Sequence, residues 1–356
     1  MTVSSVAPGL SLRWVARGAP ALAVLGAFVL GACLIALTGV PLARAFAAFA
    51  EGIFGSEYAL VGSLMRAVPL SLVGLGYILA ERANLTNVGA EGQIAVGGIA
   101  STAVALYGGA AALPGPLAFL YPLLAGALAG AAWGAIAGIA KARRGSNEVI
   151  TTLLLGFVAL QLVYGSVQSD ALLRQPVTGS STLPESLPIP ASTELPLLTA
   201  GSALPLHIGI VMALGLAFVV WLLLARSSLG LLLAAVGQNP LASLRAGLSV
   251  RTLLVVALAA SGALGGLAGA VMIQGDQHYL TAGFSSGFGF DGLVVGLLAR
   301  GSAAQVLAFA LLFGALRSGG LSMEMSAQVP SAVVVICQGL IVVTTAAAAA
   351  LTRQRA

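Results

Sequence analysis

Apolar runs close to twenty residues long recur along almost the whole chain, and they constrain its fold more than any other feature. An α-helix needs about 20 such residues to cross the hydrocarbon core of a bilayer. Charged residues make up only 8% of the 356 residues, against about 25% in soluble domains, so they are too few to cover a water-facing surface. The alternating strands of a membrane barrel are not visible. The pattern predicts an all-α polytopic membrane protein.

The apolar runs predict about ten transmembrane helices within one membrane domain that spans residues 1–356. The eighth and ninth runs are short for a full crossing. Residues 1–18 precede the first run and are predicted to be a cytoplasmic N-terminal segment. The predicted helices cover residues 19–40, 59–80, 93–110, 117–140, 149–165, 206–225, 252–273, 288–299, 302–317 and 330–350.

Basic residues concentrate on one side of this topology. With the N-terminus inside, twelve fall on the inner side and three on the outer side, as the positive-inside rule requires. The net charge of +5 therefore needs no nucleic acid partner to explain it. The twelve are Arg13, Arg17, Arg82, Lys141, Arg143, Arg144, Arg226, Arg245, Arg251, Arg300, Arg353 and Arg355, and the three are Arg44, Arg174 and Arg317.

The two cysteines, Cys33 and Cys337, lie in separate apolar segments, so neither a disulfide nor a metal framework is expected. Residues 30–33 (Leu-Gly-Ala-Cys) resemble the cleavage box of a bacterial lipoprotein signal. The apolar run continues well past Cys33, which favours an ordinary first helix.

Residues 166–205 form the longest stretch outside the predicted helices and fall on the outer side of the predicted topology. They are rich in Pro, Ser and Thr, which favours an irregular, extended path. Two interpretations stay open: a passive connector between helices, and a contact surface for an external delivery protein.

A short polar island at residues 236–247 separates two apolar runs, and its pattern predicts a small surface helix. Asn239 can cap it, Pro240 suits its first turn, and Gly247 can end it. Its leucines share one stripe, which is the form that a membrane protein needs to grip a soluble partner. These leucines are Leu241, Leu244 and Leu248.

Two segments share the pattern glycine, any residue, acid, glycine, any residue and two apolar residues. They are residues 89–95 (Gly-Ala-Glu-Gly-Gln-Ile-Ala) and 289–295 (Gly-Phe-Asp-Gly-Leu-Val-Val). An odd number of predicted helices separates them, so they would point in opposite directions, as in the inverted repeats of transporters. Chance is a competing explanation in a chain this rich in Gly and Ala.

The first copy belongs to a polar cluster at the inner end of two apolar runs, formed by Asn84, Asn87, Glu91 and Gln93. Polar groups at membrane depth line cavities or satisfy broken helices, which makes these residues candidates for the transport pathway. The alternative is a short inner loop in which Glu91 favours the positive end of a helix.

The second copy brings Phe288, Phe290 and Asp291 together on the predicted outer side, just after Phe284. The aromatic rings could stack on a flat ring or fill gaps between helices, and Asp291 could be a plain helix-start acid. We include Phe288, Phe290 and Asp291 among the pathway candidates.

Several absences argue against an enzyme. Lys141 is the only lysine, so the sequence has no Gly-rich phosphate loop with its Lys-Ser/Thr pair. His207 and His278 are far apart and lack zinc-ligand spacing. Residues 261–269 contain two overlapping Gly-x-x-x-Gly spacings, which favour close packing within the molecule over a dimer seam.

Together these segments resemble the permease subunits of bacterial ABC importers in the ribose and branched-chain amino acid group, and more narrowly the nucleoside and simple-sugar permeases. The stretches that carry the resemblance are residues 83–93, 146–152, 235–240, 261–264 and 289–293, within about 65–345. The chain departs from many members in its long segment at 166–205.

This resemblance implies an inner-membrane protein with both termini in the cytoplasm, working by alternating access. It implies a separate ATPase that carries ATP and Mg, a homologous or identical second permease, and an external substrate-binding lipoprotein. Residues 237–247 match the family's cytoplasmic coupling helix, which implies ATPase contacts by Gln238, Asn239, Pro240, Ser243, Leu244 and Arg245. Nucleosides are the first expected substrate and simple sugars the second; a self-contained secondary transporter is the alternative mechanism.

Overall fold

The computed structural model describes residues 26, 29–178, 183–199, 204–336 and 339–340. In this part of the chain the regular structure is helical, and β-pairing is confined to isolated bridges. The predicted all-α class is therefore confirmed. The predicted N-terminal segment 1–18, the start of the first predicted helix, Cys337 and most of the last predicted helix lie outside the described residues.

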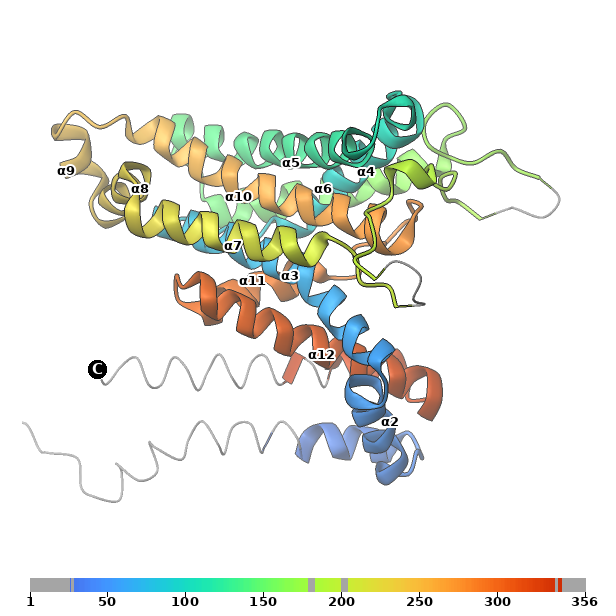
Figure 1. The fold of residues 1–356 in the computed structure, drawn as a ribbon. Helices are drawn as coiled ribbons and strands as arrows, with labels where there is room; N and C mark the ends of the chain where they lie inside the picture. The colour runs from blue at the N-terminus through green and yellow to red at the C-terminus, as the bar shows by residue number, and fades with distance from the viewer. Residues whose placement is uncertain (1–25, 27–28, 179–182, 200–203, 337–338, 341–356) are drawn as a thin grey trace, which may run out of the picture. The chain divides into compact units, whose positions relative to one another are not determined.

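The longer helices are drawn in Figure 1. They are α2 (Leu42–Phe54), α3 (Glu57–Arg82), α4 (Ala90–Tyr107), α5 (Pro116–Arg144), α6 (Glu148–Gln168), α7 (Gly209–Arg226), α8 (Ser228–Gln238), α9 (Pro240–Arg245), α10 (Val250–Met272), α11 (Phe288–Ala299) and α12 (Ala303–Ala327).

Eight of the predicted apolar runs correspond to α3, α4, α5, α6, α7, α10, α11 and α12. Six described helices are long and apolar enough to cross a membrane, or up to seven if the bent pair Val29–Leu37 and Leu42–Phe54 is one span. The structure therefore supports six or seven spans among the described residues, and ten crossings stay a prediction. At 1.5 Å per residue, the 12 residues of α11 extend only about 18 Å, well short of the bilayer core. The helices α2 and α8 had no counterpart among the predicted runs.

The chain forms two compact units. The smaller unit contains residues 1–60 and 315–356. Its helices Val29–Leu37 and Leu42–Phe54 meet at an angle of 116°, since Gly39 has a positive φ and Pro41 precedes α2. Its apolar core comprises Ile35, Ala45, Ala48, Met323, Ala327, Val329 and Val334.

In the larger unit, residues 61–314, glycines let the backbones of α4, α5 and α10 touch. A Cβ at Gly97 would overlap the backbone of Gly266, and one at Gly130 would overlap the carbonyl of Gly262. We call Gly97, Gly126, Gly130, Gly134, Gly262 and Gly266 the glycine seam. The Gly-x-x-x-Gly spacings of α10 thus serve packing within the chain, as predicted.

The connection between α6 and α7 is anchored to the bundle by Gln274, which is fully buried. Its side-chain Nε2 donates to the carbonyls of Thr193 at 2.6 Å and Phe119 at 2.9 Å. Ser101 donates to its Oε1 at 3.3 Å, and the backbone N–H of Leu195 donates to its carbonyl at 2.9 Å. The described part of residues 166–205 is irregular, as predicted, and it is tied to α4, α5 and α10. Nothing in the sequence pattern had marked Gln274.

His207 lies at the end of this connection and is 2% exposed. Its Nδ1 accepts a hydrogen bond from the backbone N–H of Gly209 at 3.1 Å. Burial lowers the pKa of His207 from 6.5 to about 4, because the charged imidazolium loses hydration there. The ring is therefore neutral at physiological pH.

This burial predicts that acid loosens the connection near His207. When the segment opens, the histidine regains a pKa near 6.5 and binds protons better than in the closed state. Its stabilising contribution is complete above that pH and is lost progressively as the pH falls towards 4. We expect faster hydrogen exchange at the amides of Leu198 and Ile208 at pH 5 than at pH 7, after correction for intrinsic exchange rates.

A matched pair of variants isolates this effect. His207→Asn retains an acceptor for the Gly209 amide but cannot take up a proton. In this variant, hydrogen exchange at Leu198 and Ile208 should no longer be faster at pH 5 than at pH 7, after correction for intrinsic rates. His278→Asn removes the neighbouring, partly exposed histidine, which contributes less to the lowered pKa of His207 than burial does, and should leave most of the acid dependence intact. Equal acid dependence in His207→Asn and in the unaltered chain would refute the assignment.

The glycine seam predicts a large cost for any side chain placed in it. Gly266→Val should destabilise the protein by about 3 kcal/mol or more, because the added atoms meet the backbones of Gly126 and Gly130. The control is Gly215→Ala on α7, where a Cβ meets nothing within 4 Å. Thermal unfolding in detergent should show a lowered midpoint for Gly266→Val and little change for Gly215→Ala; equal midpoints would contradict the packing.

Candidate transport site and coupling helix

The polar cluster predicted from the sequence lies where the chain leaves α3 and starts α4. Asn84 turns the chain with φ 55°. The backbone N–H of Val88 then donates to Thr152 Oγ1 of α6 at 3.2 Å, and Gly89 lies so close to α6 that a Cβ would stand 2.6 Å from the Thr152 carbonyl. The α6 start fixes the extended segment 84–89 from one side.

The start of α6 is itself well defined. The Asn147 side chain accepts from the backbone N–H groups of Val149 at 2.9 Å and Ile150 at 3.4 Å, so it caps the helix. Glu148 forms an ion pair with Lys141 at 2.7 Å. The segment 146–152, one of those that carry the family resemblance, thus holds the α5–α6 turn together and supports residues 84–89.

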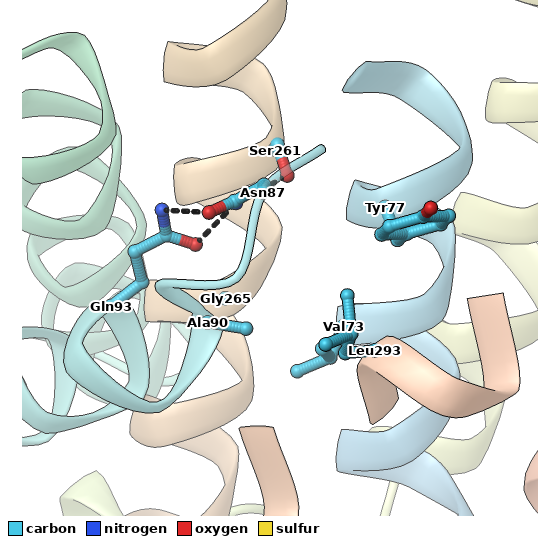
Figure 2. Close-up of a pocket in the computed structure, with 8 residues that line it drawn as sticks. All are labelled: Val73, Tyr77, Asn87, Ala90, Gln93, Ser261, Gly265 and Leu293. Carbon is cyan, nitrogen blue, oxygen red and sulfur yellow. Dashed lines mark hydrogen bonds between the residues drawn. The ribbon is translucent and has the colours of Figure 1, made fainter. Parts of the chain in front are cut away.

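Two predicted residues, Asn87 and Gln93, meet in a buried hydrogen-bond network. Asn87 Nδ2 donates to Gln93 Oε1 at 3.0 Å, and Gln93 Nε2 donates back to Asn87 Oδ1 at 3.3 Å. Asn87 Nδ2 also donates to Ser261 Oγ on α10 at 2.8 Å, and Asn87 Oδ1 accepts from the backbone N–H of Gly89 at 3.0 Å. Figure 2 shows the two carboxamides facing each other.

A crevice opens beside this amide pair. The gaps between its lining residues are too narrow to admit a water molecule. Val73 and Tyr77 of α3 and Leu293 of α11 form one wall, opposite the amide pair (Figure 2). The remaining lining residues are Ala90, Ser261 and Gly265. The crevice is thus narrow, and its lining combines polar and apolar groups.

Glu91 lies one turn from this network but serves a different purpose. Its carboxylate accepts hydrogen bonds from Ser285 Oγ at 2.6 Å and from the backbone N–H groups of Gly287 at 3.0 Å and Gly289 at 2.7 Å. Gly287 is the N-cap residue of α11, so the carboxylate satisfies N–H groups that a helix start leaves unpaired. Glu91 is 5% exposed and stabilises the start of a helix far away in sequence.

The two copies of the repeated motif therefore meet. A Cβ at Gly289 would overlap the backbone of Glu91, and one at Gly292 would overlap Val73. The prediction that the copies lie on opposite membrane sides was wrong, because the chain runs back into the bundle before α11 begins. The starts of α4 and α11 lie side by side, with one carboxylate between them.

The other predicted pathway residues are spread around this junction. Phe288 and Asp291 are half-buried in the first turn of α11, and Phe290 is exposed on the same turn. Phe284 is buried, with its ring against Gly98 of α4, so it fills a gap between helices. Asn84 is exposed and lies away from the crevice lining.

The polar island forms α9, as predicted. Asn239 caps it by accepting from the Ala242 N–H at 2.9 Å, Pro240 begins it, and Gly247 turns the chain with φ 83°. Leu241 and Leu244 are 58% and 61% exposed. Of the predicted contact residues, Gln238, Asn239, Pro240, Leu244 and Arg245 are exposed, and Ser243 is buried.

Within the larger unit, α9 lies at one end of the bundle and the α6–α7 connection at the other (Figure 1). Beneath α9, the buried residues Leu233 and Val236 of α8 pack with Ala80, Ala83, Leu85, Ala137, Leu253, Ala257 and Leu258. Gly237 lies so close to the α3 exit that a Cβ would be 2.6 Å from the Arg82 carbonyl and 3.0 Å from the Asn84 nitrogen. The helix α9 is thus joined through α8 to the segment that leads to Asn87.

The sequence did not indicate that Tyr77, Ser261 and Gly237 adjoin the site, because only the packing of the helices brings them there. A polar residue within an apolar run, such as Ser261, was the one local feature that could have indicated a buried polar contact. Among the described residues no group of three or more His, Cys, Asp or Glu side chains could hold a metal ion.

The bundle of apolar helices, with a polar crevice within it and an exposed helix at one end, defines a multi-pass membrane permease. Residues 59–345 match the family described as the permease component of branched-chain amino acid transport systems. The chain belongs to this family of ABC transporter permeases, whose members are transport components rather than catalytic subunits.

Curated relatives agree with this assignment. The chain is 36% identical to the guanosine ABC transporter permease protein NupP of Bacillus subtilis, over 93% of each chain. It is 34% identical to the glucose ABC transporter permease protein TsgB13 of Haloferax volcanii, over 92% of this chain and 87% of the relative. The nucleoside ABC transporter permease protein NupB of Lactococcus lactis is 29% identical over 90% of this chain and 88% of the relative. No solved structure matches the chain significantly.

The Glu91 contacts predict that its charge stabilises the start of α11. Glu91→Gln keeps the shape but offers one acceptor oxygen in place of two, which should cost about 1–3 kcal/mol. Hydrogen exchange should accelerate at the amides of Gly287 and Gly289. Glu51→Gln, at an exposed carboxylate on α2, is the matched control. Unchanged protection of both amides in Glu91→Gln would disprove the capping role.

Proposed function

We propose that this chain is the membrane-spanning subunit of an ATP-driven importer for nucleosides. The family membership over residues 59–345 carries the proposal that the chain is a permease. The choice of nucleosides rests on the relatives named for guanosine and nucleoside transport. A simple sugar is the second candidate, which a relative named for glucose transport favours.

The proposed mechanism is alternating access driven from outside the chain. A separate ATPase binds ATP and Mg and contacts α9 through Gln238, Asn239, Pro240, Leu244 and Arg245. The exposed leucines Leu241 and Leu244 suit the hydrophobic core of such an interface, since burying each would remove apolar surface from water. Ser243 would act indirectly: its backbone carbonyl accepts from Leu248 at 3.0 Å, which closes α9.

The packing beneath α9 supports a route for this coupling. Movement of α9 would pass to α8, and from Gly237 to the α3 exit at Arg82 and Asn84. Asn84 is three residues from Asn87 in sequence, so displacement of this turn would change the amide network beside the crevice. The tight backbone contact at Gly237 leaves little slack to absorb such a movement.

The proposed pathway passes the junction of α4 and α11. Asn87 and Gln93 present polar groups to it, and Phe288, Phe290 and Asp291 lie on the first turn of α11. Asn84 and Glu91 would contribute by positioning the two helix starts. Opening the crevice on alternate sides would move a solute past this junction.

The charge distribution supports an orientation in the bacterial inner membrane with both termini in the cytoplasm. Lys141, Arg143 and Arg144 end α5 on the side of α9, which would face the cytoplasm. The α6–α7 connection carries Asp170, Glu185 and Glu194 and would face outward, where an external substrate-binding lipoprotein would deliver the solute. A second permease, homologous or identical, would complete the channel.

Transport by the reconstituted complex tests the function. Vesicles containing this chain, its ATPase, its second permease and the receptor should accumulate labelled nucleosides only when ATP is supplied. Uptake of glucose in place of nucleosides would support the second candidate. Accumulation against a gradient by this chain alone would refute the importer mechanism in favour of a self-contained secondary transporter.

The coupling role of α9 predicts that charge on its exposed face uncouples transport. The double variant Pro240→Glu with Leu244→Glu should insert normally yet lose most ATP-driven uptake, by about tenfold or more, because carboxylates would be desolvated in the interface. Pro240→Ala with Leu244→Met keeps the surface apolar and should retain uptake. Normal transport by the charged double variant would count against the role of α9.

A further inference from the structure

The two carboxamides in the crevice are paired in a way that suits exchange with a ligand. Asn87 and Gln93 each donate one N–H and accept one with the other, at 3.0 and 3.3 Å. Both side chains are 2% exposed, so opening the pair without a substitute would leave buried polar groups unpaired. A ligand that replaces the pair has to present a donor beside an acceptor in one plane.

We infer that Asn87 and Gln93 read the hydrogen-bonding edge of a nucleobase, and that Tyr77 provides the surface on which the base ring stacks. This inference rests on the nucleoside permease proposed above and goes beyond it by naming the groups that select the base. Nucleobase edges present coplanar donors and acceptors, which Asn and Gln side chains bind in a bidentate manner. Neighbouring hydroxyl groups of a sugar can also donate to and accept from a carboxamide, but a sugar lacks the flat aromatic face that a base can stack on Tyr77.

Tyr77 has the position that stacking requires. It lies on α3 across the crevice from the amide pair, and its side chain is labelled opposite Asn87 in Figure 2. The Tyr77 ring lies against α11. A Cβ at Gly296 would be 2.7 Å from Tyr77 Cγ, so only a glycine at position 296 leaves room for the ring. Val73 and Leu293 extend the apolar wall, and a flat aromatic ligand buries more surface there than a hydroxylated sugar does.

Ser261 makes the exchange possible. Its Oγ accepts the second hydrogen of Asn87 Nδ2 at 2.8 Å, and Gly89 N–H holds Asn87 Oδ1 at 3.0 Å. Asn87 therefore keeps two partners when Gln93 turns towards a ligand. Gln93 depends on Asn87 in the contacts shown here, so it is the amide that gains most from the base. Ligand binding then requires the walls formed by α3 and α11 to move away from α4 and α10.

The test uses the full importer in vesicles, with the same receptor and ATPase in every sample, so that any changed preference belongs to this chain. The readout is the ratio of kcat/KM for guanosine to that for adenosine. A carboxamide pairs with either base, whereas the carboxylate of Gln93→Glu only accepts, which suits the adjacent N1–H and N2–H donors of guanine. Gln93→Glu should raise the ratio about tenfold, the effect of one hydrogen bond gained or lost.

A second pair of variants tests the stacking surface without relying on Gln93. Tyr77→Leu should lower uptake of both nucleosides about tenfold relative to Tyr77→Phe, because stacking on an aromatic ring is worth that much per base. Ser71→Ala is the matched control: Ser71 is a buried serine of α3 that donates to the Ala67 carbonyl of its own helix and lies outside the crevice lining. Ser71→Ala should take up both nucleosides as fast as the unaltered chain does.

The outcomes separate this inference from the proposed function. If the unaltered complex imports nucleosides but Gln93→Glu leaves the ratio unchanged, the base-reading role of the amide pair is overturned and the nucleoside importer stands. Equal uptake by Tyr77→Leu and Tyr77→Phe overturns the stacking role. If Gln93→Glu fails to fold, this comparison alone tests whether the crevice binds the base. An unaltered complex that imports sugar but no nucleoside overturns the proposed substrate and this inference together.

Discussion

A helix can begin inside an apolar bundle only if its first N–H groups find acceptors, and in this protein the carboxylate of Glu91 supplies them for α11. Unsatisfied backbone groups are very costly where water is absent. Glu91 accepts from Gly287, Gly289 and Ser285, so its carboxylate lies at the positive end of α11. Because Glu91 belongs to the first turn of α4, one interaction fixes two helix starts and the junction beside the crevice.

The glycine seam packs α4 tightly against α5 and α10. Because glycine has no side chain, the backbones of α4, α5 and α10 touch at Gly97, Gly130 and Gly266, so movement of one helix would displace its neighbours. At the end near α9, Gly237 likewise lets the backbone of α8 lie directly against residues 82–84 at the end of α3. The crevice with its paired amides lies in the same unit of the chain. The larger unit thus combines tight backbone packing with a buried polar network.

Local signals were sufficient to predict much of the fold and the short helix α9. Apolar runs located eight of the described helices, because burial in lipid demands apolar residues over a defined length. Asn239, Pro240 and Gly247 fixed α9, because caps and helix ends depend on neighbours in sequence. The bend between Val29–Leu37 and Leu42–Phe54 and the helix α8 escaped prediction. The opposite placement of the two repeated motifs was wrong, since hydropathy carries no information about a segment that re-enters the bundle.

The sequence by itself determined that this is an all-α membrane protein, that its resemblance is to ABC importer permeases, and that residues 240–245, within the polar island, form a short and largely exposed helix. Each of these follows from composition, periodicity or a short motif, all of which are properties of neighbouring residues. Only the tertiary structure decided that Glu91 caps α11, that Asn87 pairs with Gln93 and Ser261, and that Tyr77 faces them. These contacts join residues as much as 198 positions apart, and the packing of helices, rather than any local pattern, determines which of them meet.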